Sequence, residues 1–172
     1  MGSTLTNATH KIPDAIIDIR YGSSNNIAKK PLYKHKKILL LPEAAKTLAS
    51  AANKLRRQGY RIVIWDTYRP PEVQEILREI CSDNRYVHID SNHCRGISVD
   101  LSLTDPKGKY LDMGTDFDEF CEKAHLAAPG LTVEQKNNRD ILAKNMVAAG
   151  FTQTPYEWWH FDYLSLGQSG CN

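Results

Sequence analysis

The chain has 172 residues, with 22 Lys and Arg against 20 Asp and Glu, so its formal net charge is +2. This charge is too small to indicate binding to nucleic acid or to an anionic membrane. No run approaches the roughly 18 apolar residues of a membrane-spanning helix, and polar residues 1–11 contain no apolar core of a secretory signal. We therefore expect a cytoplasmic protein with one domain, residues 1–172. A periplasmic location stays open if an N-terminal leader has been removed.

The first half of the chain predicts two strands and two helices. Residues 13–21 alternate well enough for a strand, and the β-forming residues 61–65 predict another. Residues 42–58 are predicted as a helix, because a proline suits its first turn and a glycine follows its end. A turn then leads into a helix over 72–81, whose predicted inward residues are Val73, Ile76, Leu77 and Ile80.

Residues 96–103 alternate apolar and polar side chains and predict a half-buried strand. Asp100 lies on its polar face, and His93 comes from the loop before it. The turn residues 105–108 suggest a hairpin that returns through Tyr110 and Leu111. The predicted apolar face consists of Ile97, Val99, Leu101 and Leu103.

The last third of the chain predicts two helices and a final strand region. Residues 115–118 resemble a capping box that opens a short helix to about His125, and residues 132–135 open a helix that ends before Gly150. Strand structure resumes at Phe151. Because strands and helices are mixed without strict alternation, we predict an α+β fold with a central, mainly antiparallel sheet flanked by helices.

The four cysteines, Cys81, Cys94, Cys121 and Cys171, form no CxxC pair and no zinc-finger spacing. We expect them to be reduced, as in a cytosolic protein. Cys94 lies between two candidate metal ligands, where a thiolate can compete for zinc. A histidine and a carboxylate already flank it, so we interpret Cys94 as a spectator.

Two stretches contain the residue types of a catalytic zinc site. His93 and Asp100 lie seven residues apart in the first stretch, and Glu157 and His160 lie three apart in the second. Catalytic zinc sites use three protein ligands and leave a fourth position to water, whose pKa the metal lowers toward about 7. His93, Asp100 and His160 supply such a set. Glu157 is the natural candidate for a general base that is not itself a ligand.

The spacing of Glu157 and His160 sets a geometric condition. Residues three apart in a regular strand point to opposite faces, so both side chains cannot face one metal from a strand. Either this segment is helical, or Glu157 lies on the irregular entry to a strand. Pro155 and the aromatic residues that follow it favour the second alternative.

With both stretches in view, the chain resembles the D-alanyl-D-alanine dipeptidases of the zinc M15 peptidases, a group that includes the vancomycin-resistance dipeptidase. Their Ser-x-His-x-x-Gly-x-Ala-x-Asp pattern corresponds to residues 91–100, with Ser98 in place of alanine and Cys94 where serine is common. Their Glu-x-Trp-His pattern corresponds to residues 157–160. The likeness extends to residues 19–21, 65–70 and 113–118.

The resemblance implies an M15 peptidase, hedgehog-like zinc fold with one Zn²⁺ per chain on His93, Asp100 and His160. It makes Glu157 the general base and proton shuttle. It also implies that Arg69 stabilises the oxyanion, and a guanidinium suits this role because its donors are fixed and always charged. The alternative for Arg69 is a surface ion pair at the start of a helix.

Further residues correspond to the parts of the family's site that hold the substrate. Asp118 matches the residue that receives the substrate ammonium; the alternative is helix capping together with Thr115. Ser91 matches a position associated with the substrate carboxylate and Tyr21 one that lines the pocket, and both have the alternative of being polar loop residues. Asp66 is a candidate to orient Arg69 or a histidine.

We therefore predict a zinc-dependent dipeptidase, a hydrolase that cleaves free D-Ala-D-Ala, a cell-wall precursor. Its role is either glycopeptide resistance or the recovery of D-alanine. One alternative is a zinc carboxypeptidase or endopeptidase on longer cell-wall peptides. Others are a non-catalytic zinc-binding domain and a metal-free structural domain. The predicted partner is the small dipeptide, with no nucleic acid and no membrane, and the oligomeric state is left open.

Overall fold

Among the described residues, the main sheet has five strands in the order β2-β4-β5-β7-β6. The computed structural model describes residues 4–164. Strand β2 is parallel to β4, and the other neighbouring pairs are antiparallel, which confirms the predicted α+β class with a mainly antiparallel sheet. The strands are β2 (Ile16–Ile17), β4 (Arg61–Asp66), β5 (Ser98–Thr104), β6 (Thr152–Gln153) and β7 (His160–Asp162); β1 (Thr6–Asn7) and β3 (Leu39–Leu40) form a separate pair.

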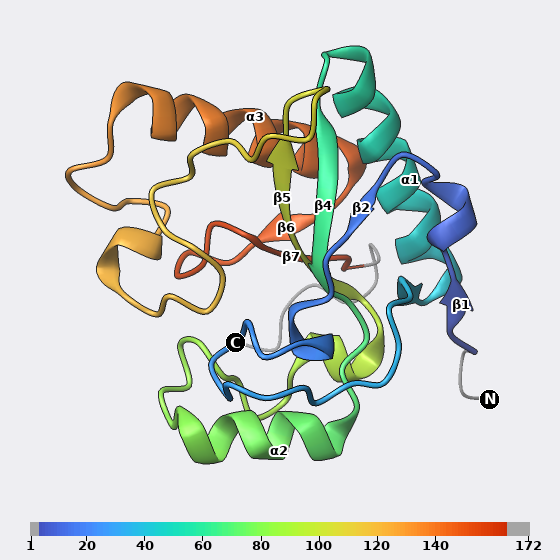
Figure 1. Ribbon diagram of the computed structural model, residues 1–172, viewed down its shortest axis with the longest axis vertical. Helices are drawn as coiled ribbons and strands as arrows, with labels where there is room; N and C mark the ends of the chain where they lie inside the picture. Colours follow the sequence, from blue (N-terminus) through green and yellow to red (C-terminus); the bar gives the residue numbers. More distant parts are fainter. Residues whose placement is uncertain (1–3, 165–172) are drawn as a thin grey trace.

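The α-helices of the described residues are α1 (Pro42–Arg57), α2 (Pro71–Ile80) and α3 (Val133–Ala149). Helix α1 packs against both α3 and β4. Helix α2 lies apart from them, below the ends of the strands in the view of Figure 1. Short 3₁₀ turns occupy η1 (Thr9–Lys11), η2 (Arg20–Gly22), η3 (Asn92–Arg95) and η4 (Glu122–Ala124).

Helices α1 and α3 begin at the residues that the sequence marks as helix starts. Pro42 occupies the first turn of α1, where its missing N–H removes no helical hydrogen bond. At the start of α3, Thr132 accepts a hydrogen bond from the Gln135 backbone while the Gln135 side chain accepts one from the Thr132 backbone. This reciprocal capping box confirms the predicted start of α3.

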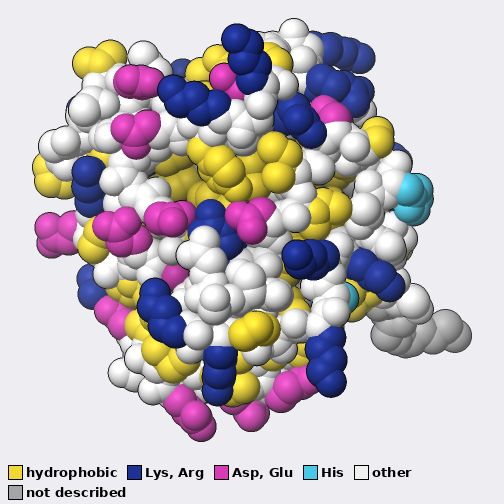
Figure 2. Space-filling model, viewed as in Figure 1, with side chains coloured by type: hydrophobic (Ala, Val, Ile, Leu, Met, Phe, Trp, Pro, Cys, Tyr) yellow, Lys and Arg dark blue, Asp and Glu magenta, His cyan; other side chains and the backbone are white. Residues whose placement is uncertain are grey.

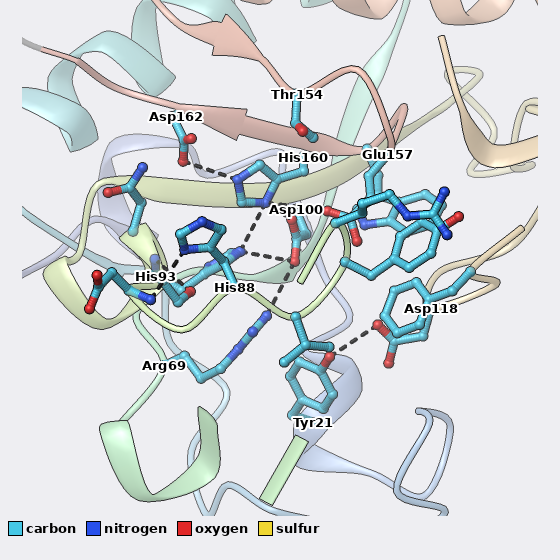
Figure 3. A pocket seen from close by; sticks show the side chains of 18 residues that line it. Tyr21, Arg69, His88, His93, Asp100, Asp118, Thr154, Glu157, His160 and Asp162 are labelled. Carbon is cyan, nitrogen blue, oxygen red and sulfur yellow. Dashed lines mark hydrogen bonds and ion pairs between the residues drawn. The ribbon is translucent and has the colours of Figure 1, made fainter. Parts of the chain in front are cut away.

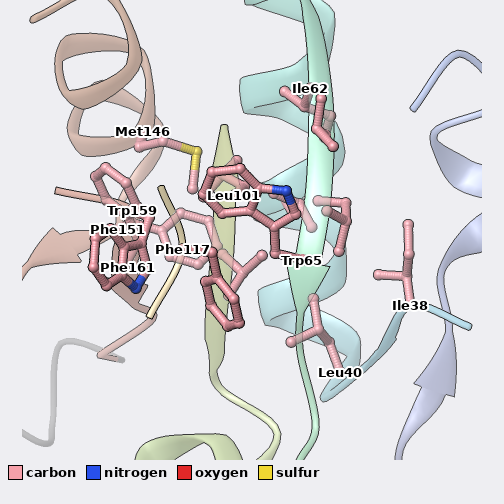
Figure 4. Packing of buried hydrophobic residues seen from close by; sticks show 14 of the residues in the cluster. Ile38, Leu40, Ile62, Trp65, Leu101, Phe117, Met146, Phe151, Trp159 and Phe161 are labelled. Atoms are coloured by element: carbon pink, nitrogen blue, oxygen red, sulfur yellow. The ribbon is translucent and has the colours of Figure 1, made fainter. Parts of the chain in front are cut away.

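Strand β5 is buried on both of its faces, so the prediction of a half-buried strand was wrong. Its apolar residue Leu101 is fully buried in the hydrophobic core, part of which is drawn in Figure 4. On the polar face, Trp65 and Trp158 line the same cavity as Ser102. Alternation showed which residues share a face, but not that aromatic side chains from elsewhere cover the polar one.

Two other local predictions were only partly right. The strand predicted over 13–21 is reduced to Ile16–Ile17 and is followed by a 3₁₀ turn. In α2, Val73 and Leu77 are buried and Ile76 is half-buried, but Ile80 is 46% exposed rather than inward. A helical period identifies the apolar side of a helix, but not how far along the helix the core extends.

The surface carries charges of both signs. On the face shown in Figure 2, Lys and Arg side chains lie among Asp and Glu side chains, and no extended field of one sign forms there. Within residues 4–164, no helix combines the length and the apolar composition needed to cross a lipid bilayer.

Candidate active site

Two neighbouring strands bring the candidate metal ligands together. Asp100 on β5 is the direct partner of His160 on β7 in the antiparallel ladder. His93 comes from the 3₁₀ turn just before β5 and points at the same place (Figure 3). One ligand atom from each of the three residues lies within 4.8 Å of the others, so the fold brings the three candidate ligands together.

The three side chains meet through particular atoms. Asp100 Oδ1 lies 2.9 Å from His160 Nδ1, and Asp100 Oδ2 lies 3.2 Å from His93 Nε2. His93 Nε2 and His160 Nδ1 are 3.2 Å apart. Two ring nitrogens and a carboxylate thus converge on one small volume from three sides.

In each histidine ring, one nitrogen faces the cluster (the inner nitrogen), and the other faces away from it (the outer nitrogen). Both outer nitrogens lie next to a hydrogen-bond acceptor. His93 Nδ1 lies 2.6 Å from the Thr67 carbonyl oxygen, and His160 Nε2 lies 3.0 Å from Asp162 Oδ1. Each outer nitrogen therefore carries a proton, so each inner nitrogen can give its lone pair to a metal ion, which would replace any proton held there. Three lone-pair donors of the N, N, O type suit a tetrahedral zinc ion with one position left open.

The charges around this cluster favour a cation at its centre. Burial opposes ionisation of Asp100, but the nearby His93 and His160 hold the pKa of that carboxyl well below its usual range. Burial also opposes a charged His160, but the carboxylates of Asp162 and Asp100 raise the pKa of its ring well above the ordinary value. The residues present therefore fit a bound divalent metal in charge as well as in atom type.

Asp162 is a residue of this site that our reading of the sequence missed. It accepts hydrogen bonds from His160 Nε2 and from the Ser98 hydroxyl. The signal was available, because residues two apart in a strand point to the same face. Asp162 therefore had to lie beside His160 if the final segment was a strand.

Arg69 lies in a buried network rather than in a surface ion pair. Its guanidinium donates from Nε and Nη2 to Asp66 Oδ2 at 3.0 and 2.8 Å, and from Nη1 to Gln74 Oε1 at 2.6 Å. Asp66 is itself fixed by the Tyr33 hydroxyl and the Thr67 amide. A bulge in β4 places Asp66 opposite Asp100, and Arg69 Nη2 lies 3.7 Å from Asp100 Oδ2.

Glu157 lies in the turn before β7, on the irregular entry to the strand that we favoured from the sequence. Its Oε2 atom is 4.0 Å from His160 Nδ1, so the turn allows both side chains to face the cluster. The side chain is buried, and burial raises the pKa of Glu157 to about 8. A carboxyl with such a pKa exchanges protons readily near neutral pH.

Asp118 lies in an irregular loop, so the predicted helix over 115–125 was wrong. Its φ of 60° is left-handed and is incompatible with a helix, and Thr115 accepts a hydrogen bond from Trp158 Nε1 instead of capping. The Asp118 carboxylate accepts hydrogen bonds from the Tyr21 hydroxyl at 3.0 Å and from the Ile27 amide at 3.1 Å. Burial raises the pKa of Asp118 to about 7.

A cleft of about 280 Å³ connects these groups. This volume lies at the lower end of small-molecule sites and suits a small ligand. Ser91 lines the cleft, and its hydroxyl oxygen accepts a hydrogen bond from the His93 amide. Other cleft residues that the sequence did not single out include Arg85, Tyr86, His88, Asn92, Thr154 and Trp159.

The described cysteines take no part in the cluster. Cys81, Cys94 and Cys121 are free and half-buried. Cys94 lines a separate groove beside α2, and burial raises the pKa of its thiol, which disfavours the thiolate that zinc would need. The fourth cysteine, Cys171, lies outside the described residues.

Comparisons with known proteins show which families and relatives this chain is similar to. A family profile of the M15 peptidases, described as D-ala-D-ala dipeptidase, matches residues 2–168. A D-alanyl-D-alanine dipeptidase of Escherichia coli K12 is 37% identical over 153 residues, 87% of this chain and 79% of that protein. The protein of the same name from Enterococcus faecium is 29% identical over 168 residues, 84% of this chain and 83% of its own length.

Among solved structures, the vancomycin-resistance D,D-pentapeptidase VanY in complex with Zn(II) is similar over 75% of each chain, with a TM-score of 0.49 and 15% identity. The LD-carboxypeptidase LdcB is similar over 74% of this chain and 60% of its own, with a TM-score of 0.48 and 20% identity.

Proposed function

Because the chain belongs to the M15 peptidases of the D-Ala-D-Ala dipeptidase family, we propose that it hydrolyses free D-alanyl-D-alanine to two molecules of D-alanine. The convergence of His93, Asp100 and His160 beside the buried Glu157 is the observation that carries this proposal. We propose that residues 1–172 form one dipeptidase domain that binds one zinc ion.

In this proposal, His93, Asp100 and His160 hold the zinc ion. Zinc supplies Lewis-acid chemistry when bound, which polarises a carbonyl and acidifies water. Thr67 and Asp162 keep the protons of His93 and His160 on the outer nitrogens, so the inner nitrogens stay available as ligands.

Glu157 performs the proton transfers. Its carboxylate accepts a proton from the attacking water and later gives that proton to the leaving amine. The raised pKa of about 8 supports both roles, because the protonated and ionised forms are then close in free energy near neutral pH. Burial also keeps bulk water from competing for the proton.

Arg69 stabilises the negative charge that develops on the carbonyl oxygen. Asp66 and Gln74 hold its guanidinium in place before any substrate arrives, so little reorganisation is needed during the reaction. A mobile surface arginine would not be organised in this way.

The two ends of the dipeptide are recognised by different residues. Asp118 receives the ammonium, and Tyr21 lines that part of the cleft and donates to the same carboxylate. Ser91 binds the terminal carboxylate of the substrate with its hydroxyl. The biological role is either glycopeptide resistance or the recovery of D-alanine as a nutrient.

A panel of dipeptides tests the proposal. Purified protein is offered D-Ala-D-Ala, its L-containing stereoisomers, N-acetyl-D-Ala-D-Ala and longer cell-wall peptides, each with and without a chelator. We expect rapid hydrolysis of the free D,D-dipeptide alone, and loss of activity with the chelator. Equal rates on the N-acetylated dipeptide, or preferred cleavage of the longer peptides, would make it a carboxypeptidase or endopeptidase instead.

A further inference from the structure

Helix α3 buries polar side chains toward an irregular part of the chain. Gln135 donates to Asp112 Oδ2, and Asn138 donates to the Asp112 carbonyl oxygen. Arg139 is only 7% exposed, yet no carboxylate of the described residues lies within 4.0 Å of its guanidinium. A buried cation without a nearby counter-charge is costly unless its nitrogens find hydrogen-bond acceptors.

The donors of Arg139 go to three backbone carbonyl groups. Nε donates to Met113 at 2.7 Å, Nη2 to Lys123 at 2.8 Å and Nη1 to His125 at 3.0 Å. These acceptors lie at the two ends of residues 113–125, which we call the Asp118 loop. One planar guanidinium therefore joins both ends of the loop, which the single ammonium of a lysine cannot match.

The tip of the Asp118 loop is held by residues near the start of the chain. Asp118 receives hydrogen bonds there from Tyr21 and from the Ile27 backbone. The loop has almost no regular structure of its own, only the 3₁₀ turn Glu122–Ala124. Its shape therefore depends on contacts with other parts of the chain. Besides the contacts at its tip and the guanidinium at its ends, these include the ion pair of Asp116 with Arg20 and the packing of Phe117 on aromatic rings.

The same guanidinium also touches the segment that contains Glu157. It lies over the Trp158 ring at 5.6 Å, and this ring donates from Nε1 to the Thr115 hydroxyl at 2.7 Å. The Trp158 backbone amide donates to the Ala124 carbonyl oxygen at 3.1 Å. Arg139 thus connects the loop of Asp118 with the residue next to Glu157.

We propose that Arg139 is a positioning residue that sets the requirement for a free amino terminus, by holding Asp118 at a fixed place relative to Glu157. It touches neither substrate nor metal ligand and acts only through the Asp118 loop and Trp158. This inference rests on the proposed function, since it assigns a cause to the recognition of the ammonium.

Three variants test the inference. Arg139→Met removes the guanidinium, Arg139→Lys keeps the positive charge without the guanidinium, and Asn145→Leu is the matched control. Asn145 is a buried polar residue of the same helix, but its partners are Gln58 and Ile141 rather than the loop. For Arg139→Met we expect KM for free D-Ala-D-Ala to rise about tenfold with kcat within about threefold, since small misplacements of binding groups have effects of this size. The KM of Arg139→Lys should lie between the values of the wild type and Arg139→Met. The KM of Asn145→Leu should equal that of the wild type.

The ratio of kcat/KM for the free dipeptide to that for its N-acetylated form is the decisive kinetic quantity. It should drop about tenfold in Arg139→Met, because the N-acetylated dipeptide has no ammonium for Asp118 to bind. A ratio equal to that of the wild type in both Arg139 variants overturns the inference.

Amide hydrogen exchange gives a readout that needs no substrate. Exchange within residues 113–125 should accelerate in Arg139→Met and remain as in the wild type in Asn145→Leu. Unchanged exchange in Arg139→Met, or equal acceleration in the control, overturns the inference. If wild-type protein fails to cleave the dipeptide, the proposed function fails, while the exchange experiment still decides whether Arg139 holds the loop.

Discussion

Asp100 and His160 face each other across β5 and β7, and Oδ1 of the carboxylate lies 2.9 Å from Nδ1 of the ring. Strand pairing therefore brings together residues that the sequence separates by 60 positions. Since one ladder holds both residues, the backbone keeps their Cα atoms opposite each other, and the side chains need only span the short distance between them. This rigidity underlies the predictions for the metal.

Removal of the metal should abolish hydrolysis. We expect the purified protein to contain about one zinc per chain, the usual content of a mononuclear catalytic site. Dialysis against a chelator should remove both zinc and activity, and added zinc should restore both. Elemental analysis with a parallel activity assay measures this. Full activity in zinc-free protein would contradict the proposed mechanism.

Replacing a ligand should weaken zinc binding more than replacing an aspartate elsewhere. Asp100→Asn removes the anionic donor, and we expect zinc affinity to fall by about 100-fold or more, beyond the range seen when groups behind the ligands are lost. Competition with a chromogenic chelator measures the affinity. Asp140→Asn, on the exposed side of α3, is the control and should bind zinc as the wild type does.

Asp162→Asn tests the residue behind His160. Without the carboxylate, the ring of His160 is a poorer donor and its tautomer is no longer fixed. We expect zinc affinity to drop by about 10- to 100-fold, as for other groups that orient metal-bound histidines. The same chelator competition checks this, and an affinity equal to that of the wild type would show that Asp162 has no such role.

Glu157→Gln should separate chemistry from metal binding. The amide keeps the size of the side chain but cannot accept the proton, so kcat should fall by about 10²- to 10⁴-fold. Zinc content should remain that of the wild type. Glu134→Gln at the exposed start of α3 provides a control with the same chemical change. Full turnover in Glu157→Gln would rule out its role as base.

The pH dependence of KM should reflect the ionisation of the Asp118 carboxyl group. Burial raises the pKa of this carboxyl to about 7, so it becomes neutral as the pH falls through that value and loses its attraction for an ammonium. KM for the free dipeptide should therefore rise by up to about tenfold per pH unit below 7. In Asp118→Asn, KM should be high and should lack this dependence. Initial rates between pH 5.5 and about 8.5 measure both curves.

The same pKa has a consequence for stability. A carboxyl whose pKa is raised on folding stabilises the fold fully below its unfolded pKa of about 4, and this contribution is lost as the pH rises through about 7. In thermal unfolding of the substrate-free protein, the Tm of Asp118→Asn should therefore increase relative to the Tm of the wild type as the pH rises from about 4 to about 8. A constant difference in Tm across this range would mean that Asp118 has an ordinary pKa.

The sequence predicted best what local patterns determine. Helices α1 and α3 begin where Pro42 and Thr132 provide end signals, and the alternation around Asp100 marked β5. Two of the three candidate ligands were close in sequence, and the motif around His160 supplied the third.

Features that depend on distant contacts were missed. Residues 115–118 have the composition of a helix cap, but Tyr21 and Ile27 engage Asp118 and hold the segment as a loop. Helix α3 buries Asn138 and Arg139 because backbone carbonyl groups lie opposite them, which no hydropathy pattern reveals. The role of Gln74 could not be predicted from the sequence either, because its hydrogen-bond partners are the Arg69 guanidinium and the His88 carbonyl group.

The late position of β7 in the chain has a consequence for biosynthesis. Strand β7 and the turn before it follow every other element of the site in the order of translation. A growing chain therefore has His93 and Asp100 long before it has Glu157 and His160, and domains fold as the chain emerges. The proposed zinc site is therefore complete only once β7 has joined the sheet.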